Sequence, residues 1–310
     1  MFRRTSRAIR RAAVCAAALA ATALAVGTAA ALPHAPWSDP EPVAAERASA
    51  PRAEALAAAA GSGPRTLSLL GRKSNGRLYD YEPNGTGGVK PAVDLGGGFA
   101  DATALVQAGH SENGTGTDLY FRMGKTLYYT AERGNETKVV GGGWDIYNLM
   151  MSAGNLGGTA HDDLIGRDAA GDLWLYQGKA DGMLAARIRI GTGWNSMDVL
   201  TGRGDYTGDG KPDLIARSTT GTLYIYSGTG NATTDAVLGT RVTVGTTWGT
   251  TAYKTLVSVG DSNGDGKADL IGVDPAGALW LFKGTGNASA PFEARTQIGT
   301  SGWAAFNTLF

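Results

Sequence analysis

The chain has 310 residues, of which 47 are glycine without a Gly-X-Y period, so its composition excludes collagen and favours many tight turns. Basic and acidic residues number 28 each, but five of the arginines lie within residues 1–31. Without that segment the net charge is −5, which argues against binding to nucleic acid or to anionic membrane surfaces.

Residues 1–31 predict a signal peptide. A basic stretch at 1–11 precedes an alanine-rich apolar run at 12–31, which ends in small residues that offer a cleavage site. The alternative is a transmembrane anchor, but the run is weakly hydrophobic and Pro33 follows it closely. Paired arginines in the basic stretch also permit a twin-arginine signal. We therefore expect a secreted, extracellular protein with no integral membrane segment after cleavage.

The residues that follow predict a spacer and a protein without disulfides. The only cysteine, Cys15, lies near the start of the apolar run and would be removed with it. A secreted protein without cysteine needs another stabilising device. Residues 32–64 carry six prolines among Ala, Glu and Arg and show no strand pattern, so we expect a Pro/Ala-rich flexible tether.

The rest of the chain repeats itself. Each copy reads as two short strands joined by a turn that contains glycine, as in the alternation of Leu173 and Leu175 with Trp174 and Tyr176. Such a strand is apolar on both faces and must be covered on both sides. The five copies span 67–81, 118–129, 163–178, 213–228 and 269–284.

A third strand follows each copy, then a glycine-rich turn with one aromatic residue, then a closing strand. The aromatic residues recur at spacings of 45, 50, 54 and 55, and they are Phe99, Trp144, Trp194, Trp248 and Trp303. Four strands in each period of this length predict an all-β fold, a single β-propeller of about five four-stranded blades.

The two ends of the repeat region complement each other. The first copy lacks the closing strand, and the chain finishes with one at 306–310. Pairing of this strand with residues 67–70 would complete the first blade from the N- and C-terminal strands and remove exposed sheet edges. We therefore expect residues 65–310 to form one closed propeller; an open stack of sheets would leave two exposed apolar ends.

Two acidic loops, 205–213 and 261–269, lie between the closing strand of one unit and the first strand of the next. Oxygen-bearing residues at alternate positions suit a small hard cation, and we expect Ca²⁺. The predicted ligands are the carboxylates of Asp205, Asp209, Asp213, Asp261, Asp265 and Asp269, the side-chain oxygens of Thr207 and Asn263, and the backbone carbonyls of Lys211 and Lys267.

These loops are not EF-hands, because Ala216 and Gly272 stand where the closing Glu would be and because strands flank them. The alternative is a plain acidic turn, in which three carboxylates within nine residues would repel without benefit. The corresponding segments 110–118 and 155–163 have lost most of their acids, so we expect no ion there. Calcium would stabilise the folded state.

The loop pattern D-x-[DNT]-x-D-G-x-x-D followed by Leu-Ile resembles the FG-GAP or VCBS repeat of integrin α-chain propellers and many secreted bacterial proteins. The resemblance covers 65–310 and is most specific at 205–217 and 261–273. It implies blade-type repeats, calcium loops and extracellular adhesion or ligand binding. Integrin-like propellers usually have seven blades, whereas this chain has about five; five-bladed lectins of the tachylectin type are a parallel by architecture only.

The sequence contains no common catalytic motif. His110 and His161 stand in the degenerate loops, and we expect both to be solvent-exposed bystanders. The predicted function is a non-catalytic, monomeric binding or adhesion module for an extracellular glycan or protein. The repeated tryptophans would either stack on sugar rings or pack between blades. The alternative is a secreted polysaccharide- or ester-acting hydrolase or lyase, which needs a non-repeated cluster of acids or histidines at one end of the central channel.

Overall fold

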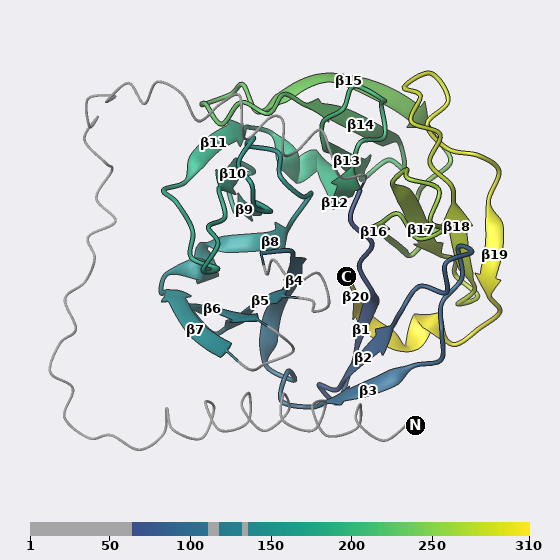
Figure 1. Cartoon of the computed structure of the whole chain (residues 1–310), viewed down its shortest axis with the longest axis horizontal. Coiled ribbons are helices and arrows are strands. Elements are labelled where there is room, and N and C mark those ends of the chain that lie inside the picture. Colours follow the sequence, from purple (N-terminus) through teal and green to yellow (C-terminus); the bar gives the residue numbers. More distant parts are fainter. Residues whose placement is uncertain (1–63, 111–117, 132–135) are drawn as a thin grey trace, which may run out of the picture.

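The computed structural model describes residues 64–110, 118–131 and 136–310. They form five four-stranded antiparallel sheets arranged around one axis, as the blades of a β-propeller (Figure 1). The predicted signal peptide, 1–31, and all but the last residue of the predicted tether, 32–64, lie outside the described residues. Within the described ranges, no helix is long and apolar enough to cross a membrane.

The twenty strands are short, and three 3₁₀ turns precede inner strands. In chain order the elements are β1 (Leu69–Lys73), β2 (Leu78–Tyr81), β3 (Val93–Gly96), β4 (Ala102–Ala108), β5 (Asp118–Met123), β6 (Thr126–Ala131), β7 (Glu136–Gly141), η2 (Trp144–Ile146), β8 (Tyr147–Met151), β9 (Leu164–Asp168), β10 (Leu173–Tyr176), β11 (Ile188–Gly191), η3 (Trp194–Ser196), β12 (Met197–Gly204), β13 (Asp213–Ser218), β14 (Leu223–Gly228), β15 (Leu238–Gly245), β16 (Thr255–Gly260), β17 (Asp269–Val273), β18 (Leu279–Phe282), β19 (Thr296–Gly299), η4 (Trp303–Ala305) and β20 (Phe306–Leu309).

Each blade runs from an inner strand near the axis to an outer strand at the rim. Blade 1 has the order β20-β1-β2-β3, and blades 2 to 5 are β4–β7, β8–β11, β12–β15 and β16–β19. The inner strands β4, β8, β12, β16 and β20 surround the centre in Figure 1, and β3, β7, β11, β15 and β19 lie at the rim. The predicted five-bladed propeller is therefore confirmed.

The predicted closure is also confirmed. The last strand, β20, pairs antiparallel with β1, with Arg72 opposite Thr308 and Gly71 opposite Leu309. Leu70 and Phe310 exchange backbone N–H to carbonyl bonds of 3.0 and 2.9 Å. The segment before β1 also reaches blade 5, since the Leu67 N–H donates to the Val259 carbonyl at 2.8 Å. Strands far apart in sequence thus close the ring.

Apolar side chains pack between neighbouring blades, as the two-faced strands require. Ile165 and Leu175 of blade 3 share one cluster with Leu214 and Ala216 of blade 4, and all four side chains are fully buried. Because every middle strand is covered on both faces, removal of a blade would expose large apolar areas on both of its neighbours. Stability therefore depends on the contacts that hold one blade to the next.

One such contact is a backbone hydrogen bond that recurs at each blade junction. At the start of blade 4, the Trp194 N–H donates to the carbonyl of Gly171, in the β9–β10 turn of blade 3, at 2.9 Å. Gly171 has φ +88° and lies so close to the next blade that a Cβ would sit 3.0 Å from the Asn195 side chain. Only glycine fits this turn without strain. The equivalent donors are Phe99, Trp144, Trp248 and Trp303.

A second inter-blade contact, which we call the arginine clamp, was not predicted from the sequence. Nη1 of Arg167 on β9 donates to the carbonyls of Trp194 and Met197, at 2.9 and 2.5 Å, and so spans the 3₁₀ turn that opens blade 4. Equivalent pairs join Arg72 to Phe99 and Ala102, Arg122 to Trp144 and Tyr147, and Arg217 to Trp248 and Tyr253. Blade 5 carries Val273 at this position and has no such clamp; there the bond from the Leu67 N–H to the Val259 carbonyl joins blades 1 and 5.

We predict that Arg217→Ala lowers the free energy of unfolding by about 3 kcal/mol, because it leaves two buried carbonyls and the Asp198 carboxylate without their cation. The Arg217 side chain is 2% exposed, and its Nε and Nη2 donate to both Asp198 oxygens at 2.8 Å. Urea titration followed by tryptophan fluorescence measures the loss. The control is Arg189→Ala, which removes an exposed pair with Asp235 and should change little. Equal effects of the two variants would contradict a structural role for the clamp.

Candidate metal centre

The two acidic loops occupy equivalent places in blades 4 and 5. Loop 205–213 connects the inner strand β12 to β13, and loop 261–269 connects β16 to β17. Both lie where inner strands end, whereas the junction turns lie where inner strands begin. The propeller therefore has a loop end and a junction end, and the predicted ligands gather at the loop end.

The first loop is folded around the carboxylate of its first residue. Oδ1 of Asp205 accepts the N–H groups of Thr207 and Gly208 at 3.0 and 2.6 Å, and Oδ2 accepts that of Gly210 at 2.7 Å. Asp209 turns back on the chain in the same manner, since its Oδ1 accepts the N–H of Lys211 at 2.9 Å. These bonds fix the positions of two of the predicted ligands.

The ninth residue ties this loop to the rest of blade 4. Asp213 is fully buried, and its Oδ2 accepts the N–H groups of Tyr206 and Thr207 at 2.8 and 2.9 Å. Its Oδ1 accepts the N–H of Gly228 at 3.1 Å, at the end of β14. Burial, with a smaller contribution from the nearby charge of Asp205, raises the pKa of Asp213 to about 6 against the lowering effect of the backbone donors.

The three carboxylates of the first loop converge. One oxygen from each of Asp205, Asp209 and Asp213 lies within 4.8 Å of the other two, and Oγ1 of Thr207 lies 3.4 Å from Oδ1 of Asp205. Three like charges this close repel one another unless a cation lies between them. An all-oxygen donor set suits Ca²⁺ and is a poor match for zinc. The residues present therefore fit the predicted ion.

The second loop has the same framework with a different arrangement of its acids. Oδ1 and Oδ2 of Asp261 accept the N–H groups of Gly264 and Gly266 at 2.7 and 2.8 Å, and Asp269 joins the loop to the end of β18. Here Nδ2 of Asn263 donates to Oδ2 of Asp265 at 3.0 Å. Among the described residues, only the first loop brings three acids within 4.8 Å. Lys211 and Lys267 contribute their N–H groups to the acids, and their predicted role as carbonyl ligands stays a prediction.

The degenerate loop 155–163 shows what this framework needs. Asn155 replaces the first Asp, and its Oδ1 accepts the Thr159 N–H at 2.8 Å. The ninth residue, Asp163, accepts the N–H groups of Gly157 and Gly178 at 2.6 and 3.4 Å, as its equivalents do. A turn at this place therefore forms with an amide at its first position, although Asn155 accepts fewer backbone N–H groups than Asp205 does. Loop 110–118 lies outside the described residues between 111 and 117.

The expectation that the two histidines are exposed is wrong. His110 is 2% exposed, and its ring lies 5.8 Å from that of His161, which is half-buried. Nε2 of His110 lies 3.0 Å from the hydroxyl of Tyr120, which donates to the Gly182 carbonyl, so Nε2 carries the hydrogen. Burial lowers the pKa of His110 to about 4, outweighing the opposing charges of Asp162 and Asp118. His110 is a neutral, buried side chain.

A buried ion pair nearby joins three blades at the loop end. Nη1 of Arg203 on β12 donates to Oδ2 of Asp162 at 2.9 Å, and the two side chains are 8% and 9% exposed. The same Asp162 oxygen accepts the Gly109 N–H at 2.9 Å, and Arg203 also donates to the Gln107 carbonyl. This non-repeated cluster was not predicted. Its members are buried, so it links blades 2, 3 and 4 and offers no accessible acid to a substrate.

The repeated tryptophans are core residues. Trp144, Trp194 and Trp303 are 4%, 7% and 8% exposed, and Trp248 is half-buried. Each stacks at a tilt on the aromatic residue near the end of its blade's third strand, with ring centroids 4.5 to 4.8 Å apart, and those partners are Tyr176, Tyr226, Tyr81 and Phe282. The packing interpretation is supported, and these rings are not free to stack on sugars.

Comparison with known proteins supports the resemblance drawn from the sequence. Residues 205–272 match the family model of the FG-GAP-like repeat, a stretch that holds both acidic loops. The chain is thus a five-bladed β-propeller of the FG-GAP type. The comparison with curated proteins gave no match.

Several solved structures match this chain at low identity and with low TM-scores. A crystal structure of a nidogen/laminin complex has 12% identity, covers 78% of this chain and 96% of its own, and has a TM-score of 0.40. AofleA from Arthrobotrys oligospora has 11% identity, with 73% and 66% covered and a TM-score of 0.41. A Dos1 propeller has 12% identity, with 78% and 75% covered and a TM-score of 0.35.

The buried Asp163 should give the protein a pH-dependent stability. Burial raises its pKa to about 7, and backbone donors only partly oppose this. The folded state then holds a proton that the unfolded state has released, so the free energy of unfolding falls as pH rises from about 4 to 7. We predict that Asp163→Asn flattens this slope by on the order of 2–4 kcal/mol across the interval.

The measurement is urea unfolding at a series of pH values with EGTA present, which isolates the effect from calcium. The amide costs one hydrogen bond at every pH, so the informative quantity is the slope and not the absolute stability. Parallel curves for the variant and the parent chain would contradict the assignment to Asp163.

Proposed function

We propose that this FG-GAP-type β-propeller is a secreted, calcium-stabilised, non-catalytic binding module. The observation that carries the proposal is the convergence of Asp205, Asp209 and Asp213, of which loop 155–163 keeps only the last as an acid. Asn155 in loop 155–163 supports the same turn without a charge, so the additional carboxylates call for another explanation. A divalent cation supplies it, because it removes their mutual repulsion.

Calcium has a stabilising role in this proposal. Asp205, Asp209 and Asp213, with Thr207, would hold it in blade 4, and Asp261, Asn263, Asp265 and Asp269 would hold it in blade 5 after Asp265 turns from Asn263 toward the ion. Each ion would join the end of an inner strand to the start of the next strand. In a chain whose mature part carries no cysteine, this replaces the cross-link that a disulfide provides in other secreted proteins.

The binding role rests on the architecture and on the absence of an exposed reactive cluster among the described residues. His110 and Asp162 are buried, and Asp162 is paired with Arg203 of the next blade. Such a rigid ring presents two broad ends, each built from loops of several blades. The partner that we propose is an extracellular glycan or protein, bound by a monomer.

The calcium prediction is tested by thermal unfolding with Ca²⁺ and with EGTA. At an ion concentration 100 times the dissociation constant, each site contributes about 2.7 kcal/mol, which corresponds to a rise in Tm of roughly 5–10 °C. Titration calorimetry should count two ions. The double variant Asp205→Asn/Asp209→Asn should bind one ion and keep part of the Tm increase.

The matched control is Asp101→Asn, an exposed acid at the junction end, which should bind two ions and match the parent Tm. The same Tm with Ca²⁺ and with EGTA would refute the stabilising role of calcium. Separate incubation of the pure protein with polysaccharides and esters tests the non-catalytic assignment, and turnover would favour the hydrolase or lyase alternative.

A further inference from the structure

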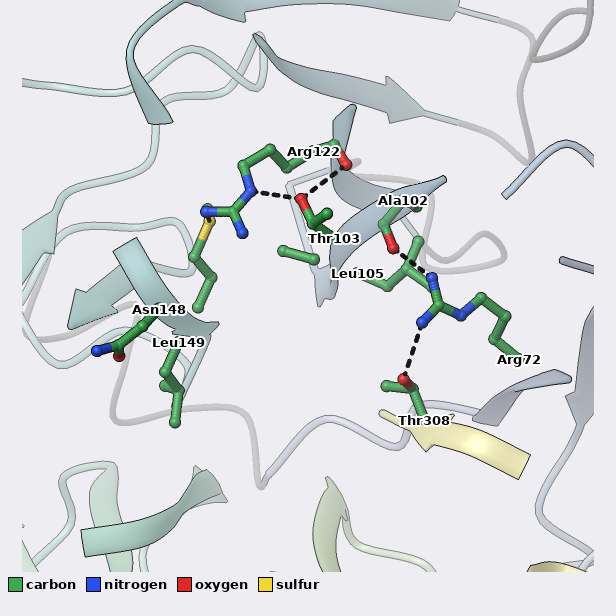
Figure 2. Close-up of a pocket in the computed structure, with 10 residues that line it drawn as sticks. Arg72, Ala102, Thr103, Leu105, Arg122, Asn148, Leu149 and Thr308 are labelled. Carbon is green, nitrogen blue, oxygen red and sulfur yellow. Dashed lines mark hydrogen bonds between the residues drawn. The ribbon is translucent and has the colours of Figure 1, made fainter. Parts of the chain in front are cut away.

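A cavity opens at the junction end of the propeller, between the inner strands of blades 1, 2 and 3. Its volume is about 210 Å³, and its lining includes Arg72, Arg122, Thr103, Asn148, Leu149 and Thr308. Figure 2 shows Arg72 with Thr308 on one side, Arg122 with Thr103 on another, and Asn148 with Leu149 beyond them. Two of its lining residues are cations, and the described residues that line it include no acid.

Both cations keep N–H groups that the arginine clamp does not use. Arg122 donates from Nε to Oγ1 of Thr103 at 2.7 Å and from Nη1 to the Trp144 and Tyr147 carbonyls. Within the described part of the chain, its Nη2 makes no hydrogen bond. Arg72 donates from Nη1 to the Phe99 and Ala102 carbonyls and from Nη2, at 3.4 Å, to Oγ1 of Thr308. Its Nε likewise has no partner among these residues.

Blade 4 shows that the fold accepts a carboxylate beside a clamp arginine. There the two carboxylate oxygens of Asp198 accept hydrogen bonds from Nε and Nη2 of Arg217, each at 2.8 Å. The equivalent partners of Arg122 and Arg167 are the neutral side chains of Thr103 and Asn148, which accept from Nε at 2.7 and 2.9 Å. Arg122 in the cavity lining thus lacks the counter-charge that the same geometry gives Arg217 in blade 4.

The charge of Arg122 is also only weakly offset by its surroundings. Its side chain is 8% exposed, and burial lowers its pKa, with Asp145 acting in the opposite direction. Asp145 itself is exposed and lies 3.4 Å from Nζ of Lys125. A buried guanidinium without a counter-ion is costly, and an anion that enters the cavity would offset that cost.

We propose that this cavity binds an oxyanion, a carboxylate or a sulfate, carried on a ligand no larger than about one acidic sugar. The volume is below the roughly 300–1,000 Å³ of pockets for drug-sized ligands, which limits the ligand to a small group or the end of a chain. Planar guanidinium groups suit two-oxygen anions. The inference names a class of ligand for the proposed binding function. The anion site itself is argued from the cavity, and only its role in the organism rests on the proposed function.

The test is titration calorimetry of the calcium-loaded protein at low salt with three probes: glucuronate, glucose 6-sulfate and glucose. We expect an acidic probe to bind and glucose not to bind, and the tighter acidic probe identifies the oxyanion. The variant Thr103→Asp places beside Arg122 the counter-charge that Asp198 gives Arg217, and it should weaken binding at least tenfold. Thr103→Asn, which matches aspartate in size without its charge, should weaken binding less than Thr103→Asp does, and Asp101→Asn, at an exposed acid outside the cavity lining, should bind as the parent does.

Asn148→Asp supplies the same charge beside Arg167 and should also weaken binding, so the test does not depend on one variant folding. Equal binding of glucose, absence of binding by both acidic probes, or unchanged affinity in the two aspartate variants would overturn the inference. The rise in Tm with Ca²⁺ is measured on the same samples. If no anion binds but Ca²⁺ still raises the Tm, the proposed anion site is wrong and the proposed stabilising role of calcium is unaffected.

Discussion

The structure depends on how each blade satisfies the backbone of the next one. Every blade after the first opens with a tight turn, and its carbonyls are buried where two sheets meet. A buried carbonyl without a donor is costly, and Arg167 supplies two donors to Trp194 and Met197 across the interface. At the one position where Val273 replaces the arginine, the Leu67 N–H donates to the Val259 carbonyl and joins blades 1 and 5 instead. Four arginine clamps therefore join successive blades, and the pairing of β20 with β1 completes the first blade from both ends of the repeat region.

Most of the architecture could be predicted because it follows from local sequence patterns. Alternation within residues 173–176 indicates a strand with two apolar faces, and the recurrence of Trp194 and its equivalents indicates the length of one blade. The missing strand of the first copy and the surplus strand at 306–310 report the closure. In the first acidic loop, Asp205, Asp209 and Asp213 are near neighbours in sequence, so their spacing was sufficient to predict that their carboxylate oxygens lie close together.

The contacts that were missed join residues far apart in sequence. An arginine recurs at the same position of the second strand in blades 1 to 4, and this repeat is visible in the sequence. Its carbonyl partners are distant, however, since those of Arg167 lie 27 and 30 residues later. Asp162 meets Arg203 across 41 residues and Gly109 across 53. The histidines were expected in solvent because His161 stands where Lys211 and Lys267 would offer only a backbone carbonyl, and His110 was interpreted in the same way. The burial of His110 comes partly from blade 3, where Gly178 lies against its ring, and the sequence of one loop does not show that contact.

Each end of the propeller carries charged groups that the fold itself does not impose. Asn155 shows that a loop can fold without an acid at its first position, and Asp198 shows that a clamp can accept a counter-charge. Folding alone therefore does not fix the number of carboxylates at the loop end or the missing counter-charge beside Arg122 at the junction end. A carboxylate can stand beside a clamp, as in blade 4, and an amide can stand at the first position of a loop, as in loop 155–163, within the same five-bladed ring.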